Sequence, residues 1–229
     1  MDLSLHPDFR FQELTIGSER APLVVIDNFV SDPEALVDIA AAKLFGDVVN
    51  YYPGIRSKVS LSYQRFFLEQ LREIFSSHFG LATAALRFTG CHFSIVTTSP
   101  EKLTNLQSIP HIDSSSSREL AFIHYLFKSD LGGTAFYRHR ATGYEYVDET
   151  RSPDYWRIVN EEQSGPDRAA PGYISGDTVH YEQVGRQDGV FNRMLIYRRN
   201  TLHSGQLARG FVPDPNPRTG RLSINGFLA

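Results

Sequence analysis

The sequence contains one cysteine, Cys91, among 229 residues. A single thiol excludes an intrachain disulfide and any zinc site built on several cysteines. We interpret Cys91 as a small buried residue of a strand, because free cysteine is among the residue types most often buried. The sequence also has no apolar run of membrane-spanning length and no signal-peptide pattern. We therefore expect no membrane partner and a reducing, cytoplasmic setting.

Positive charge is not in surplus either. The chain has 23 Lys and Arg against 26 Asp and Glu, which gives a net charge of −3. A nucleic-acid partner is not expected, since such proteins carry a basic footprint. The length fits one domain over residues 1–229. Within it we expect an N-terminal strand and supporting helices at 1–84 and a β-rich core at 85–229 with an insertion at about 148–170.

The first third of the chain carries two helical patterns. Ser31 is predicted to be the N-cap of the first helix, with Pro33 in the first turn and Glu34 completing a capping box. Gly46 is expected to end that helix. A second helix is predicted from 61 to 79, where aromatic and aliphatic residues recur at helical spacing and Gly80 follows.

The remainder is rich in strand patterns. Predicted strands cover 86–98, 119–127, 134–139, 178–182, 193–197 and 222–227. A tight turn at 130–133, ending in Gly132 and Gly133, predicts that 134–139 returns as the hairpin partner of 119–127. Helices followed by about eight strands indicate an α+β, β-dominated fold. The strand number is typical of a double-stranded β-helix, a jelly-roll or cupin-like barrel.

A metal site is indicated by Pro110-His111-Ile112-Asp113. His111 and Asp113 are two positions apart, and on a strand that spacing places both side chains on one face. A histidine from a distant strand would complete a two-His-one-carboxylate triad, which suits non-haem Fe(II) and leaves coordination positions open. His203, in the segment Leu202-His203-Ser204-Gly205, is the best candidate. The predicted metal ligands and catalytic residues are therefore His111, Asp113 and His203.

An anion-binding arginine is indicated near the end of the chain. Arg221 follows His203 by 18 positions, and its planar fork matches a carboxylate. Arg221-Leu222-Ser223 on a strand would place Arg221 and Ser223 on one face. Arg221 has the alternative of pairing with Asp214 at the surface, and Arg209 and Arg218 compete for the same role.

These segments occur in a recognisable order: His111-x-Asp113, then Gly132-Gly133-Thr134-Ala135-Phe136-Tyr137, then Leu202–Gly205, and last Gly220–Ser223. In this order the chain resembles the Fe(II)/2-oxoglutarate-dependent oxygenase superfamily, in its prolyl-hydroxylase-like branch, and within it a bacterial group with the same four segments. The resemblance covers roughly residues 85–229. The longer, proline-rich stretch between His203 and Arg221 departs from the usual pattern of that branch.

The resemblance implies a function and a set of binding residues. His111, Asp113 and His203 would hold Fe(II), and Arg221 would bind the distal carboxylate of the co-substrate 2-oxoglutarate, with help from Ser223 and Tyr125. Related halogenases carry a small residue where Asp113 stands, so the carboxylate favours hydroxylation. We expect an O2-dependent dioxygenase that hydroxylates an amino acid, a peptide or protein side chain, or a small metabolite.

Other polar residues have weaker signals. Arg138 and Arg140 form a basic cluster that either receives the substrate or belongs to a solvated hairpin end. Trp156, in the insertion, either covers the site or packs its own helix. Among the rival histidines His124, His139 and His180, we interpret His124 as a hydrogen-bonded core residue, since it lies in an apolar run.

Two other classes of function fit the same residues. The chain could be a non-catalytic sensor or interaction module that binds metal or 2-oxoglutarate, or a cupin-type metalloenzyme that does not use 2-oxoglutarate. A sensor would bind 2-oxoglutarate without releasing succinate. A cupin-type enzyme would keep its turnover when Arg221 is replaced.

Overall fold

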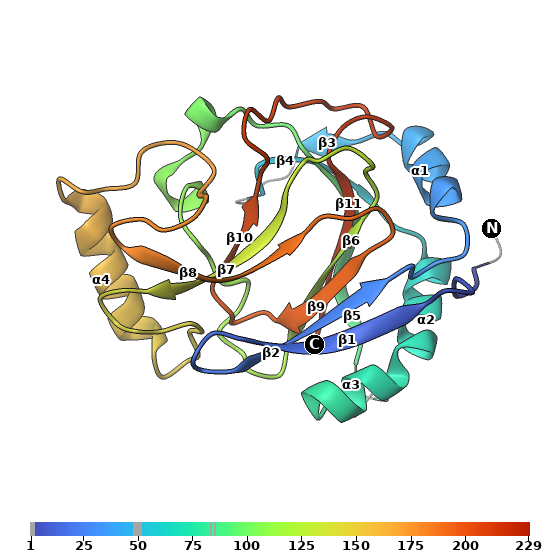
Figure 1. Ribbon diagram of the computed structural model, residues 1–229, viewed down its shortest axis with the longest axis horizontal. Helices are drawn as coiled ribbons and strands as arrows, with labels where there is room; N and C mark the ends of the chain where they lie inside the picture. Colours follow the sequence, from blue (N-terminus) through green and yellow to red (C-terminus); the bar gives the residue numbers. More distant parts are fainter. Residues whose placement is uncertain (1–2, 48–51, 83, 85) are drawn as a thin grey trace.

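The computed structural model describes residues 3–47, 52–82, 84 and 86–229. Strands dominate it, in two antiparallel sheets with few helices (Figure 1). The large sheet has eight strands in the order β1-β2-β9-β6-β11-β5-β4-β3, and the small sheet has three in the order β10-β7-β8.

Four α-helices lie among the strands along the described chain. In chain order they are β1 (Arg10–Ile16), β2 (Ala21–Asp27), α1 (Pro33–Ala41), β3 (Gly46–Asp47), β4 (Gly54–Lys58), α2 (Leu61–Gln70), α3 (Arg72–Phe79), β5 (Phe88–Val96), β6 (Leu120–Tyr125), β7 (Gly133–His139), α4 (Ser152–Ser164), β8 (Tyr181–Asp188), β9 (Met194–Arg198), β10 (His203–Gln206) and β11 (Leu222–Leu228). Short 3-10 turns at Pro100–Lys102 and Asn105–Gln107 precede β6.

Three groups of buried apolar side chains give the molecule its layers. Helices α1 to α3 cover one face of the large sheet, where Val24 belongs to the first core. The next residue, Val25, points to the opposite face and joins a second core with Phe136 of the small sheet. Helix α4 covers the outer side of the small sheet, where Tyr155 belongs to a third core (Figure 1). The second core therefore lies between the two sheets.

Helix α1 begins one residue later than predicted and ends well before Gly46. Its N-cap is Asp32, whose side chain accepts a hydrogen bond from the N–H of Ala35 at 3.0 Å. Ser31 is unavailable because its hydroxyl and its backbone N–H are both bonded to Ser4. The predicted Ser31 cap and capping box are therefore wrong, and Gly46 lies in β3 instead of ending the helix.

The predicted helix from 61 to 79 is two helices. The chain bends at Leu71, where the backbone leaves the helical region at φ −102° and ψ 12°. Leu71 is fully buried, and the bend allows both α2 and α3 to place residues such as Phe67 and Phe75 in the first core. Gly80 ends α3 in the left-handed conformation, as predicted.

The predicted hairpin of 119–127 with 134–139 is wrong. Both edges of β6 are occupied, one by β9 and the other by β11, so β7 pairs in the small sheet instead. The turn carries the chain from one sheet to the other. Gly132 has φ +87° there, and a Cβ at Gly133 would overlap the carbonyl oxygen of Gln187 on β8. Glycine is needed at both positions of this corner.

Each predicted strand overlaps an observed one, although β8 begins only at Tyr181. Strands β1, β3, β4 and β10 were not predicted. β1 is an edge strand with a largely exposed polar sequence, so its apolar alternation is weak. The N-terminal part thus adds four strands to the large sheet instead of one. Residue 85, at the expected boundary with the β-rich core, lies outside the described residues.

The helices of the described residues are all too short or too polar to cross a bilayer. Cys91 is buried on β5, as expected, with 5% of its surface exposed.

Candidate metal centre

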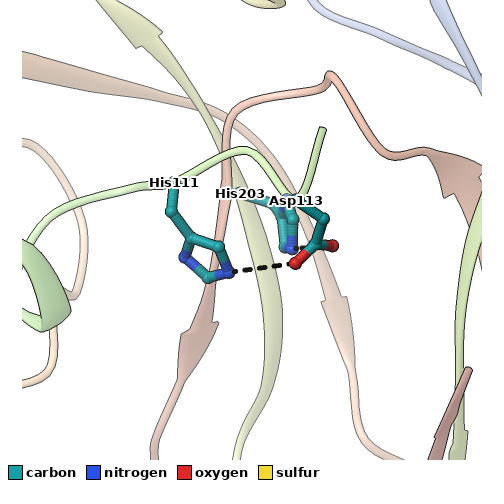
Figure 2. Close-up of side chains that lie close together, drawn as sticks. All are labelled: His111, Asp113 and His203. Carbon is teal, nitrogen blue, oxygen red and sulfur yellow. Dashed lines mark ion pairs between the residues drawn. The ribbon is translucent and has the colours of Figure 1, made fainter. Parts of the chain in front are cut away.

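Two histidines and an aspartate meet where β10 begins. His111 and His203 form an isolated antiparallel bridge in which the N–H of each donates to the carbonyl of the other, at 2.9 and 3.0 Å. Their ring centroids are 4.4 Å apart. Asp113 completes a group whose three ligand atoms all lie within 4.8 Å of one another (Figure 2). The structure therefore brings together the three residues predicted as metal ligands, here called the triad.

His203 is held in one orientation. Its Nδ1 lies 2.9 Å from the carbonyl oxygen of Thr201, so this nitrogen carries the proton and donates it. Nε2 is left to face the site, 3.5 Å from Asp113 Oδ2. The edge of the Tyr197 ring packs on the imidazole, with centroids 4.8 Å apart. A histidine fixed in this way by a carbonyl has the arrangement that metal-binding histidines use.

His111 faces open space beside His203. Its Nε2 is 3.9 Å from Asp113 Oδ1, and 47% of its side-chain surface is accessible. Desolvation by the surrounding protein and the neighbouring His203 lower the pKa of His111, against a smaller opposing effect of Asp113. Both leading effects favour the neutral ring. A neutral imidazole is the form that binds a metal ion.

Asp113 is positioned through its backbone by Arg199. The N–H of Asp113 donates to the Arg199 carbonyl at 2.8 Å, and Arg199 Nη2 donates to the Asp113 carbonyl at 3.0 Å. Arg199 also pairs with Glu119. The sequence analysis did not identify Arg199, because its contacts run through the main chain and nothing local distinguishes it from Arg198.

Arg221 is buried, with 3% of its surface exposed, immediately before β11. Nε donates to the carbonyl of Leu131 at 3.2 Å, and Nη2 donates to that of Gly133 at 2.7 Å. No carboxylate of the described residues forms an ion pair with its guanidinium. Arg221 is thus a desolvated positive charge held by two carbonyls of the Gly132-Gly133 corner.

The alternatives to Arg221 lie elsewhere. Asp214 accepts a hydrogen bond from Thr219 at 2.5 Å instead of pairing with Arg221. Arg218 forms an exposed ion pair with Asp38 at 2.6 Å, and Arg209 is exposed to solvent.

Tyr125 and Ser223 share a face of the large sheet with the second core. They are paired in register on β6 and β11, and both are fully buried. The Tyr125 hydroxyl is 2.7 Å from Thr134 Oγ1, and the Ser223 hydroxyl donates to Asn225 Oδ1 at 2.7 Å. The Arg221 guanidinium lies 5.8 Å from the centroid of the Tyr125 ring.

Two buried tyrosines connect Arg221 with the triad. Burial raises the pKa of Tyr125, and the charge of Arg221 partly offsets this. Burial also raises the pKa of Tyr197, and the nearby charge of Asp113 and the Tyr125 hydroxyl raise it further. Arg221 therefore neighbours Tyr125, and the triad neighbours Tyr197, between the two sheets.

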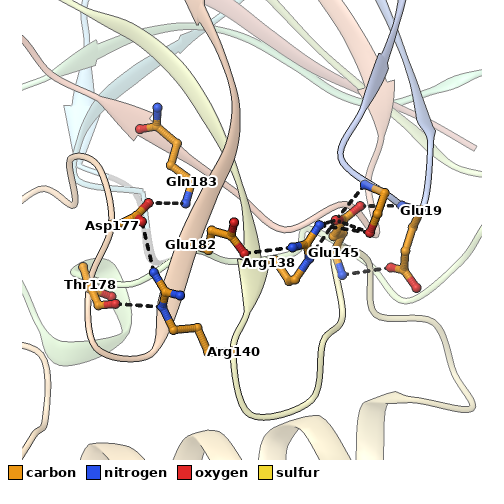
Figure 3. A network of polar contacts seen from close by, with 9 residues as sticks. Glu19, Arg138, Arg140, Glu145, Asp177, Thr178, Glu182 and Gln183 are labelled. Carbon is orange, nitrogen blue, oxygen red and sulfur yellow. Dashed lines mark hydrogen bonds and ion pairs between the residues drawn. The ribbon is translucent and has the colours of Figure 1, made fainter.

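Arg138 and Arg140, the predicted substrate residues, are engaged by carboxylates (Figure 3). Arg138 donates to Glu145 Oε1 at 2.9 Å and to Glu182 Oε2 at 2.8 Å. Arg140 donates to Asp177 Oδ2 at 3.0 Å. Their roles toward a substrate stay a prediction, and both charges already have protein partners.

Glu145 is the centre of this network. Its buried carboxylate also accepts hydrogen bonds from the backbone N–H groups of Ser18 and Glu19, at 2.9 and 2.8 Å. Burial alone would raise the pKa of Glu145, but these N–H donors and Arg138 outweigh it and hold the pKa below its usual value. The carboxylate fits only because Gly17, at φ +61°, has no Cβ. The network joins the β1–β2 turn to the small sheet.

Helix α4 contacts two of the rival histidines. Glu162 of α4 binds His139 Nε2 at 3.0 Å and lies 3.3 Å from His180 Nδ1. Trp156 packs against Tyr155, with ring centroids 5.1 Å apart, at the border of the third core. Its predicted role over the site stays untested.

His124 is a hydrogen-bonded core residue, as interpreted from the sequence. It is fully buried, and its two ring nitrogens lie 3.0 Å from the Tyr63 hydroxyl and 3.1 Å from Asn192 Oδ1. Desolvation lowers the pKa of His124 to about 4. The ring is therefore neutral at neutral pH and has no free nitrogen for a metal.

The model of a family of unknown function, DUF6445, matches residues 7–228. No curated protein matches the chain.

Two solved structures have a similar fold. One is SnoN, described as the non-haem alpha-ketoglutarate-dependent epimerase from nogalamycin biosynthesis, with a TM-score of 0.50, 12% identity, and coverage of 92% of this chain and 78% of SnoN. The other is HygX from Streptomyces hygroscopicus, solved with nickel and 2-oxoglutarate bound, with a TM-score of 0.50, 10% identity, and coverage of 92% of this chain and 84% of HygX. At these identities the similarity shows the fold.

Proposed function

This chain belongs to the family of unknown function DUF6445, and from that premise we propose that it is an Fe(II)- and 2-oxoglutarate-dependent dioxygenase. Its reaction is the hydroxylation of an amino acid, a peptide or protein side chain, or a small metabolite. Within the superfamily we assign it to the prolyl-hydroxylase-like branch. Its partners are O2 and the substrate, and its setting is cytoplasmic.

One observation carries the proposal: the triad and a buried arginine that has no carboxylate partner among the described residues both lie on the side of the second core, between the sheets. A triad alone fits several metalloenzymes. A buried guanidinium without a carboxylate is costly to the folded protein, because its desolvation is not repaid by an ion pair. A ligand that carries a carboxylate removes this cost, and 2-oxoglutarate has a carboxylate remote from its keto-acid end.

The residues present fit the metal and the co-substrate. His111 and His203 offer imidazole nitrogens, and Asp113 offers a carboxylate oxygen, which is the donor set of non-haem Fe(II) oxygenases. Arg221 would hold the distal carboxylate of 2-oxoglutarate, with Tyr125 and Ser223 beside it. Bound Fe(II) and 2-oxoglutarate would supply the oxidative chemistry, in which O2 is consumed and succinate and CO2 are released. The chain's part is orientation and exclusion of water.

Anaerobic visible absorption tests this proposal. Fe(II) and then 2-oxoglutarate are added to the wild type, Arg221→Gln and the control Arg218→Gln. We expect a weak charge-transfer band that needs both additions, with an apparent 2-oxoglutarate affinity lowered by about tenfold or more in Arg221→Gln, since a charge-assisted pair is lost. Arg218→Gln keeps the wild-type affinity because Arg218 is exposed and pairs with Asp38.

Two results would count against the assignment. Iron binding without a band on adding 2-oxoglutarate contradicts a 2-oxoglutarate enzyme and favours a cupin-type metalloenzyme. A band with unchanged affinity in Arg221→Gln removes Arg221 from the co-substrate site. Tight 2-oxoglutarate binding with no succinate release under air, with every substrate candidate tried, favours a sensor.

A further inference from the structure

A second arginine points into the space between the sheets. On β4, Arg56 is paired in register with Ser94 of β5, Ser94 is paired with Ser223 of β11, and Ser223 is paired with Tyr125 of β6. Directly paired residues lie on the same face of a sheet. Arg56 therefore shares the face of Tyr125, on the side of the second core.

The guanidinium of Arg56 has few protein partners. No carboxylate of the described residues forms an ion pair with it, and its buried Nε has no hydrogen-bond partner there. The group lies over the Tyr52 ring, 4.0 Å from the centroid. Desolvation lowers the pKa of Arg56, while Tyr52 and Asp113 act in the opposite direction. The side chain is nevertheless always charged at neutral pH.

Arg56 lies near Asp113 of the triad and, like Arg221, near Tyr52. The charge of Asp113 acts on Arg56, and the charges of both Arg221 and Arg56 act on Tyr52. One row further along β4 and β5, the charges of Arg56 and Lys58 add to desolvation in lowering the pKa of His92. Two positive charges, Arg56 and Lys58, therefore lie close together on β4.

The charges of these residues can be matched by one further anion. Among the groups that are not exposed, Asp113 contributes one negative charge, and Arg221 and Arg56 contribute one positive charge each; Lys58 is exposed to solvent and is left out of the count. A divalent metal ion and the 2-oxoglutarate dianion cancel one another, so loading the site leaves the net positive charge unchanged. The distal carboxylate of the co-substrate is matched by Arg221 and its other carboxylate by the metal. Arg56 remains unmatched.

We propose that Arg56 binds a carboxylate of the primary substrate, so that the enzyme acts on small carboxylic acids carrying one net negative charge. A single planar guanidinium matches a carboxylate in shape. A phosphate dianion would exceed the one positive charge that is left. This inference rests on the proposed function, because the charge count assumes the metal and 2-oxoglutarate, and it narrows the three substrate classes to one.

The test compares carboxylates with their own amides. The protein is loaded with Ni(II), a redox-inert substitute for Fe(II), and with 2-oxoglutarate. A panel of small monocarboxylates is then titrated beside the matched primary amides, with binding followed by ligand-observed NMR. In the wild type we expect at least one carboxylate to bind about tenfold or more tightly than its amide, because only the acid forms a charge-assisted pair.

The variants assign this preference to one residue. Arg56→Gln is expected to remove the preference while 2-oxoglutarate affinity stays within about twofold of the wild type. Arg56→Lys keeps the charge without the planar fork, so it is expected to retain part of the preference. The control Arg218→Gln keeps all of it.

Several outcomes overturn the inference. They are a panel in which no carboxylate binds better than its amide, an Arg56→Gln variant that keeps the full preference, and an Arg56→Gln variant that loses 2-oxoglutarate instead. The last result would place Arg56 at the co-substrate. Failure of the proposed function looks different, because the wild type would then fail to bind metal or 2-oxoglutarate, and the inference would fall with it.

Discussion

Two groups of charged side chains in this protein are built in opposite ways. In the hairpin network, formed by Ser18, Glu19, Arg138, Glu145 and Glu182, every charge has a partner: Glu145 accepts from two backbone N–H groups and from Arg138. Between the sheets, Arg56 and Arg221 have no carboxylate partner among the described residues. Glu145 and Arg221 are both buried, but only Glu145 has charged partners.

We interpret the charges of the hairpin network as structural, and we propose that Arg56 and Arg221 bind ligands. A complete network stabilises the junction of two distant segments, and removing one member exposes the desolvation cost of the others. An incomplete group lowers the stability of the empty protein, and a ligand of opposite charge recovers that energy on binding. The sequence contains Arg138 and Arg221 in similar β-rich settings, so only their partners distinguish the two roles.

The largest effect is expected in the hairpin network. Glu145→Gln keeps the shape but turns an amide toward N–H donors and Arg138, so we expect the free energy of unfolding to fall by about 3 kcal/mol. Because the pKa of Glu145 is lowered in the folded state, its contribution is present above the unfolded pKa of about 4.3 and is lost as the pH falls through the folded value. Urea unfolding at pH 7 and at pH 3 measures both.

Glu182→Gln is the matched control for this change. Glu182 also binds Arg138, but 40% of its side chain is exposed, so we expect a loss under about 1 kcal/mol. Equal losses for the two variants would show that the network does not depend on the buried carboxylate.

A smaller effect is expected at the support of the triad. Arg199→Ala removes a donor to the Asp113 carbonyl, so we expect Ni(II) affinity to fall by about tenfold, as for other second-layer contacts of metal sites. Isothermal titration with Ni(II) measures this. Arg198→Ala is the control, since Arg198 binds the carbonyls of Ser117 and Phe79; a similar fall there would indicate a general loss of structure.

The smallest effect has the opposite sign. Arg56→Met removes an unpartnered charge while keeping apolar contact with Tyr52, so we expect the ligand-free protein to gain up to about 1 kcal/mol of stability. Urea unfolding without metal or ligand measures this. A loss comparable to that of Glu145→Gln would mean that Arg56 is a structural charge, and the contrast between the two groups would disappear.

Much of the site could be predicted because its chemistry is local in the sequence. His111 and Asp113 are two residues apart, and Arg221 and Ser223 repeat that spacing. The grouping of His111, Asp113 and His203 needed one long-range assumption, and the structure brings the three together. Their role as ligands stays a prediction.

What could not be predicted depends on contacts between distant segments. Strand β6 has no free edge for β7, a fact set by β9 and β11 and invisible in the Gly132-Gly133 turn. Ser31 is bonded to Ser4, so the cap moves to Asp32. Arg56 lies on a strand that was not predicted, and the role proposed for it rests on the absence of a carboxylate partner among the described residues.

The bridge between His111 and His203 also has a mechanical consequence. At this point the edge of the small sheet is joined to the segment before β6 by two backbone hydrogen bonds, and the two residues are 92 positions apart. A metal ion bound to both imidazoles would cross-link the same two segments and close a long loop between them. The contact between these segments is then weakest in the apo protein. Metal loss would loosen β10 from the segment before β6 while the three cores stay packed.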